Sequence, residues 1–225
     1  MGAMMGHAGM ADVALRYLRS AGSPAPAAPR LPPLPRPALR AVRADEPPPP
    51  HTEDFRTVLG HFASGVTVIT APGADGEPPA GFACQSFASL SLDPPLVVFM
   101  VGRTSTTWPR VARAGVFCVN ILGSGQGTLC RGFAVSGAQT ADKFAGVPHT
   151  PAPATGSPRI EGVPAWVDCV IHAVHTAGDH LIVVGRVAAL GEDENAASAG
   201  PLLFHRSGFG TFDAFGTYDE RASRP

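Results

Sequence analysis

A stretch of small and polar residues, residues 81–91, carries the side chains best suited to hold a ligand. It offers serine hydroxyls, one carboxamide and backbone N–H groups, with phenylalanine rings beside them. The residues concerned are Phe82, Ala83, Gln85, Ser86, Phe87, Ser89 and Ser91. We call residues 81–91 the ledge. Its composition favours a large planar ligand with many hydrogen-bond acceptors.

A second group with binding chemistry begins at Arg103 and includes the hydroxyls of residues 104–107. Free N–H groups at a helix start, with hydroxyls and a guanidinium nearby, can bind a phosphate. The same residues could instead form an ordinary helix N-cap, so both interpretations stay open. Asn120 poses a similar choice, because an amide in an apolar strand needs either a ligand or a structural hydrogen-bond partner.

Reactive side chains give weaker indications. Cys84 could be a nucleophile and Ser86 a hydrolytic serine, but the sequence supplies neither a base nor a G-x-S-x-G motif. A metal cluster is suggested by the spacing of Cys169, His172, His175 and His180. Side chains alternate on a strand, however, so His172 and His175 would face opposite sides and could not share an ion. His180 follows a Gly-Asp turn at the mouth of a hairpin, and is either a surface turn residue or part of a site.

The elements that must position these groups are mostly strands. The ledge precedes a continuous apolar run, residues 96–101, which predicts a strand buried on both faces. Other predicted strands span residues 66–71, 79–87, 116–122, 165–175, 180–190, 202–205 and 209–212. Helices are expected over 54–63, within 103–114 as far as Gly115, and through Phe133, with a long excursion over 137–162. This order predicts a mainly antiparallel β-barrel with a few short helices.

Composition limits the remaining possibilities. The 225 residues carry a net charge of −1, so no basic surface for nucleic acid is expected. No apolar run reaches the roughly 18 residues that cross a bilayer. The Gly-rich turn at 123–127 lacks the third glycine of a dinucleotide fingerprint, because Thr128 stands there. Four single cysteines are typical of free thiols in a reducing compartment, so we expect a cytoplasmic protein.

Three regions are expected along the chain: a Pro/Ala/Arg-rich tail over 1–50, one domain over 51–215 and a short tail over 216–225. The first tail cannot bury enough apolar surface to fold, so disorder is expected. A transit peptide and a misassigned start are the other interpretations.

Several separated motifs resemble the short-chain flavin reductases, which have the FMN-binding split-barrel fold. The motifs are GVTVIT (65–70), GFACQSFASLSLDPPL (81–96), FCVNIL (117–122), DKFAG (142–146), GDH (178–180) and PLLF (201–204). The ACQSF and DKFAG motifs are most similar to reductases that partner secosteroid hydroxylases. Many members have TANSF where this chain has ACQSF, and residues 1–50 have no counterpart in the family.

The resemblance implies a site for FMN or FAD and for NADH or NADPH. It implies that the flavin lies on Ala83, Cys84, Gln85, Ser86, Phe87, Ser89, Leu90 and Ser91, largely against backbone groups. It places Ser105, Arg103 and Trp108 at the phosphate end, Phe133 near the flavin, and His180 against the nicotinamide. Asn120 is kept as a further cofactor contact. Similar proteins are homodimers.

These expectations define an NAD(P)H:flavin oxidoreductase that supplies reduced flavin to a partner monooxygenase. Hydride transfer to flavin needs no nucleophile and no metal, which agrees with the absence of a triad motif. The alternatives are a flavin- or haem-binding split-barrel protein without turnover, and a thiol-dependent enzyme that uses Cys84.

Overall fold

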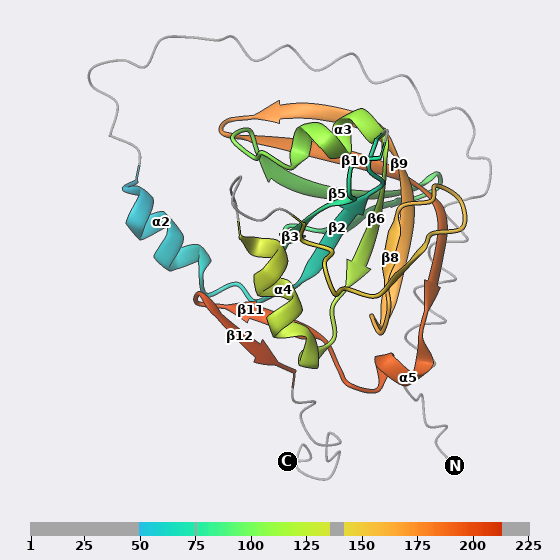
Figure 1. Ribbon diagram of the computed structural model, residues 1–225. Helices are drawn as coiled ribbons and strands as arrows, with labels where there is room; N and C mark the ends of the chain where they lie inside the picture. Colours follow the sequence, from blue (N-terminus) through green and yellow to red (C-terminus); the bar gives the residue numbers. More distant parts are fainter. Residues whose placement is uncertain (1–49, 75, 136–141, 213–225) are drawn as a thin grey trace, which may run out of the picture. The chain divides into compact units, whose positions relative to one another are not determined.

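The computed structural model describes residues 50–74, 76–135 and 142–212, and a seven-stranded antiparallel sheet forms its centre (Figure 1). Its strands are β2 (Thr67–Ala71), β3 (Ala80–Cys84), β4 (Ala88–Leu92), β5 (Pro95–Gly102), β6 (Val116–Ile121), β9 (Ala165–Ala177) and β10 (His180–Glu192). The order across the sheet is β3-β2-β6-β9-β10-β5-β4. β3 also contacts β5, so the sheet curls until its two ends approach, as in a split barrel.

Smaller elements surround this sheet. The short strands are β1 (Ser64–Gly65), β11 (Leu202–His205) and β12 (Gly208–Thr211), which form one sheet, and β7 (His149–Pro151) and β8 (Pro158–Ile160), which form another. The helices are α2 (Thr52–Leu59), α3 (Trp108–Ala114), α4 (Gly127–Ala134), α5 (Glu194–Ala197) and the 3-10 turn η1 (Ser124–Gln126). The predicted fold class, mainly antiparallel β with short helices, is confirmed.

Local turn chemistry explains two correctly predicted boundaries. Gly115 ends α3 with a φ of 70°, a conformation that glycine adopts without strain. Gly178 has a φ of 61° in the two-residue connection between β9 and β10, so the long hairpin ends next to His180 as expected.

Three expectations about strands and helices were wrong. The strand expected over 79–87 ends at Cys84, and β4 is a separate strand. β5 is buried on one face only: Phe99 is fully buried whereas Met100 is 42% exposed, because a curled sheet has one interior face. The helix expected over 54–63 is α2, which ends earlier, at Leu59, and Phe62 beyond its end is 80% exposed.

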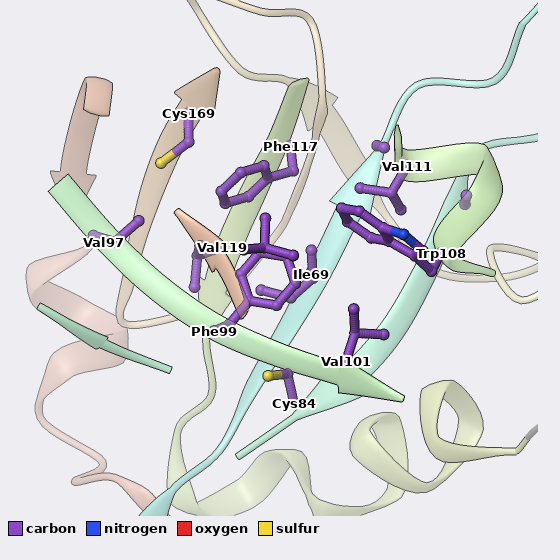
Figure 2. Close-up of a cluster of buried hydrophobic side chains, with 13 residues drawn as sticks. Ile69, Cys84, Val97, Phe99, Val101, Trp108, Val111, Phe117, Val119 and Cys169 are labelled. Atoms are coloured by element: carbon purple, nitrogen blue, oxygen red, sulfur yellow. The ribbon is translucent and has the colours of Figure 1, made fainter. Parts of the chain in front are cut away.

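The core lies inside the curled sheet. Figure 2 shows Phe99 of β5 among side chains from β2, β6 and α3. Its ring meets that of Phe117 edge-to-face, with 5.2 Å between centroids. A second cluster, which includes Phe133 and Phe144, lies between α4 and the other face of β2 and β3. The two clusters hold β3, and with it the start of the ledge, from both faces.

Residues 1–49 and 213–225 lie outside the described residues, so the expected tails are not tested. Among the described helices, none has both the length and the apolar character to cross a membrane.

Candidate active site

The ledge spans most of β3, the connection over residues 85–87 and most of the edge strand β4. Thr67 and Ser86 fix this connection. The Oγ1 of Thr67 donates to the carbonyl of Cys84 at 2.9 Å. The Oγ of Ser86 donates to the carbonyl of Met100 at 3.0 Å and accepts from the N–H of Met100 at 2.9 Å. Ser86 therefore attaches the ledge to β5.

The exposed part of the ledge is smaller than the sequence suggested. Gln85, Ser89 and Leu90 are exposed, and Ala83, Ser86, Phe87 and Ser91 are half-buried. The pairing of β4 with β5 leaves the other edge of β4 without a ladder partner among the described strands. Its backbone N–H and C=O groups are therefore free to bind a ligand.

The end of β5 joins the ledge to the predicted histidine. Two residues beyond Met100, Gly102 pairs with His180 across the β5–β10 ladder. The N–H of Arg103 donates to the carbonyl of Asp179 at 2.9 Å, and its guanidinium donates to the carbonyl of Gly178 at 3.4 Å. One strand end therefore brings the ledge, Arg103 and the GDH turn together.

His180 is exposed, and its side chain is oriented by the preceding residue. Its Nδ1 lies 2.8 Å from Oδ1 of Asp179, and this hydrogen bond, with the charge of His180, lowers the pKa of Asp179. The His180 side chain is 50% exposed, and its Nε2 lies beside Gly102, 4.0 Å from where a Cβ would stand. A ligand can therefore approach Nε2 while Asp179 holds Nδ1.

The expected phosphate group is only partly a surface site. Arg103 and Thr104 are exposed. The Oγ of Ser105 accepts from the N–H of Trp108, the first residue of α3, at 3.2 Å, whereas the N-cap residue itself, Thr107, makes no side-chain cap bond. Trp108 is 8% exposed and packs edge-to-face on Phe99, so its ring belongs to the core.

Asn120 and Phe133, expected near the cofactor, are interior residues. Asn120 is fully buried, and its amide bonds the carbonyl of Val68, the hydroxyl of Thr70 and the N–H of Ile160. Phe133 is 1% exposed. Neither side chain has surface to offer a ligand, because Asn120 is bonded to β8 and Phe133 packs against Phe144 and Gly81.

The thiol hypothesis finds no support in the geometry. Cys84 is 6% exposed, and burial raises the pKa of its thiol. Its Sγ lies 3.3 Å from Oγ of Ser86, and the side chain points into the core cluster (Figure 2). All four cysteines are buried and free, as predicted. The described residues contain no group of three or more His, Cys, Asp or Glu placed to hold a metal ion.

Two polar residues that shape the site were missed from the sequence. Asp179 was treated only as a turn residue, although an Asp directly before a His can bond its ring nitrogen. Thr67 gave no signal, because an isolated threonine within a β-branched strand is typical of any sheet.

Comparison with known proteins supplies the context for this geometry. The family model described as "Flavin reductase like domain" matches residues 59–213. A flavin reductase of Pseudomonas putida is 48% identical over 161 residues, which cover 71% of this chain and 89% of the relative. The reductase subunit HsaB of a flavin-dependent monooxygenase, from Rhodococcus jostii, is 48% identical over 152 residues, which cover 68% of this chain and 73% of the relative.

A solved structure shares the fold as well. The NADH:FAD oxidoreductase SgcE6 of Streptomyces globisporus, in complex with NAD and FAD fragments, superposes with a TM-score of 0.66 at 33% identity. The match covers 73% of this chain and 94% of that chain.

Proposed function

Because the chain belongs to the flavin reductase like domain family, we propose that it is an NAD(P)H:flavin oxidoreductase. It would reduce FMN or FAD at the expense of NADH or NADPH. The observation that carries this proposal is the end of β5, where Met100 bonds the ledge and Gly102 pairs with His180 two residues later. This arrangement puts the 85–87 connection of the ledge and an oriented histidine beside the same strand end.

The groups that line β5, from the edge strand β4 to the 85–87 connection, fit a flavin. The edge of β4 offers backbone donors and acceptors, and Gln85, Ser89 and Ser91 add side chains of the same chemistry. A planar ring with polar atoms along one edge suits such a strand edge. When bound, a flavin supplies the redox chemistry, because it accepts a hydride without a protein nucleophile or metal.

The protein's part in this reaction is to hold and orient the reactants. The ledge would hold the flavin at its polar edge, and Arg103 would lie near a phosphate. His180 would contact the nicotinamide through the Nε2 side, while the 2.8 Å contact with Asp179 keeps the ring in one orientation. Correct placement of two reactants accounts for much of the acceleration in such a reaction.

The proposal extends to partners. The HsaB relative is named as the reductase subunit of a monooxygenase, so reduced flavin would pass from this chain to a separate oxygenase, by diffusion. A homodimer is proposed because four large apolar side chains, three on α2 and one just beyond its end, are more than half exposed. They are Phe55, Val58, Leu59 and Phe62. Four free thiols are consistent with a reducing cytoplasmic environment.

Oxidation of NADH and NADPH at 340 nm, with FMN, FAD or riboflavin added in turn, tests the proposal. Oxidation that rises with added flavin and is negligible without it is the expected result. Folded protein that binds flavin but oxidises neither nucleotide would instead support a flavin carrier without turnover.

A further inference from the structure

Lys143 is the only lysine in the chain, and the other sixteen basic residues are arginines. It lies in the segment that follows α4. Its Nζ donates to the carbonyl of Phe133 at 2.9 Å and to the carbonyl of Gly81 at 3.3 Å. One ammonium therefore bridges α4 and β3 through two residues, Phe133 and Gly81, that are 52 positions apart in the sequence.

Both carbonyls belong to elements that support the proposed flavin site. Phe133 lies in the last turn of α4, where carbonyls have no partner within the helix and the helix dipole favours a positive charge. Gly81 lies in β3 and is the first residue of the ledge. β3 is an end strand of the seven-stranded sheet, so β2 pairs with it on one side only.

Side-chain packing strengthens the same junction. A Cβ added at Gly81 would lie 2.7 Å from Cε1 of Phe133, so the ring occupies the space that a larger residue would need. Lys143 is half-buried, and burial lowers its pKa because the charged form is taken from water. Asp142 does not act on this junction through its Oδ1, which accepts the N–H of Phe144 at 2.8 Å.

We propose that Lys143 is a positioning residue for the flavin site, which fixes the first residue of the ledge against the end of α4. This inference rests on the proposed function, because the ledge is taken as the flavin site. A ledge held in its binding conformation has less conformational freedom to lose when a ligand binds. The ammonium itself contacts no reacting atom, so it should affect flavin affinity and leave the rate of hydride transfer unchanged.

The geometry also gives a reason for lysine at this position. An ammonium is a compact charge with three donors that can point at carbonyls from two different elements. A guanidinium is planar and larger, and it matches acceptors that lie in one plane. An arginine should therefore replace the lysine only in part.

Flavin dissociation constants of full-length variants, measured by quenching of flavin fluorescence, test the role. Lys143→Met should weaken binding of FMN or FAD by about tenfold, the effect of one charge-assisted hydrogen bond. Its kcat at saturating flavin should stay within about twofold of wild type. Lys143→Arg should recover part of the lost affinity.

The matched control is Arg131→Met. Arg131 is a cation in the last turn of the same helix, but its guanidinium lies over the ring of Phe209, 5.2 Å from the centroid. This control should bind flavin as wild type does. The proposal is overturned if Lys143→Met keeps wild-type affinity, if Arg131→Met loses as much, or if kcat falls while affinity stays constant.

A second measurement tests the same role without requiring that the Lys143→Met variant folds. Reductive dimethylation of the folded protein keeps the charge but removes two N–H donors, and it modifies only Lys143 and the N-terminal amine. Methylated wild type should bind flavin about tenfold more weakly, whereas methylated Lys143→Arg should equal its unmodified form. Equal effects on both proteins, or none on wild type, would contradict the role.

The two proposals fail separately. If wild type binds flavin but does not oxidise NADH or NADPH, the proposed function fails and the binding measurements still decide the role of Lys143. If wild type is an active reductase and Lys143→Met has unchanged flavin affinity, only the role of Lys143 fails.

Discussion

Replacement of Ser86 by alanine should loosen the ledge and weaken flavin binding together. The Oγ of Ser86 makes two hydrogen bonds to the backbone of Met100, at 2.9 and 3.0 Å. They continue the edge pairing of β5 beyond the last β4 pair, Ala88 with Val98. Each such bond contributes about 1 kcal/mol net, so Ser86→Ala should lower the free energy of unfolding by about 2 kcal/mol.

Part of this loss in the free energy of unfolding should also weaken flavin binding. If about half of the loss, roughly 1 kcal/mol, is the cost of ordering the ledge when flavin binds, flavin affinity should fall roughly fivefold. Urea unfolding gives the stability change, and quenching of flavin fluorescence gives the dissociation constant.

Ser124→Ala is the control. It removes a hydroxyl that donates to the carbonyl of Ala199 at 2.6 Å, outside the ledge. The control should lose stability but keep flavin affinity. Unchanged affinity in Ser86→Ala, or an equal loss in both variants, would refute the claim that this contact shapes the site.

Two further predictions concern the interior. Asp168→Asn should lower the free energy of unfolding by about 3 kcal/mol in urea titrations. One oxygen of the fully buried Asp168 accepts the N–H groups of Ala154 and Thr155 at 2.9 and 3.1 Å, and the other accepts the hydroxyl of Thr155. A neutral amide has one acceptor oxygen in place of two and makes weaker hydrogen bonds, so an unchanged midpoint would contradict this. Burial raises the pKa of Cys118 and Cys169 from 9.0 to about 12, so the folded state keeps protons that the unfolded state loses. Stability should therefore fall as pH rises from 9.0 toward about 12, and a Cys118→Ala/Cys169→Ala double variant should show a smaller fall in the same urea titrations.

Local signals in the sequence predicted the elements that depend on neighbouring residues. Gly178 ends the long hairpin in a two-residue connection, and that turn places His180 at its mouth whatever the rest of the fold does. Gly115 ends α3 for the same reason. Both predictions required only the conformational freedom of glycine.

Predictions that depend on distant segments were less successful. Asn120, Trp108 and Phe133 have side chains that can bind a cofactor, and the sequence alone cannot say that other elements cover them. Asn120 is covered because β8, forty residues later, supplies the N–H that its amide accepts. The run at β5 looked buried on both faces, since apolar composition does not distinguish an interior face from an exposed one.

The ledge was predictable from the sequence only in part. Its composition predicted a polar surface that binds a ligand; Gln85 and Ser89 are exposed there, and ligand binding stays a prediction. The contacts that hold it, from Thr67, Ser86 and Lys143, each cross to another element, so no local pattern could identify them.

The central claim, that one strand end brings a bound flavin to His180, is tested most directly by His180→Ala. Flavin dissociation constants and NADH oxidation at saturating flavin would be measured for this variant and for His172→Ala, a control that removes an exposed histidine from β9. We predict that His180→Ala keeps wild-type flavin affinity and loses at least tenfold in kcat/KM for NADH, about 1.4 kcal/mol of transition-state stabilisation, while the control resembles wild type. Wild-type kcat/KM in His180→Ala would contradict the account.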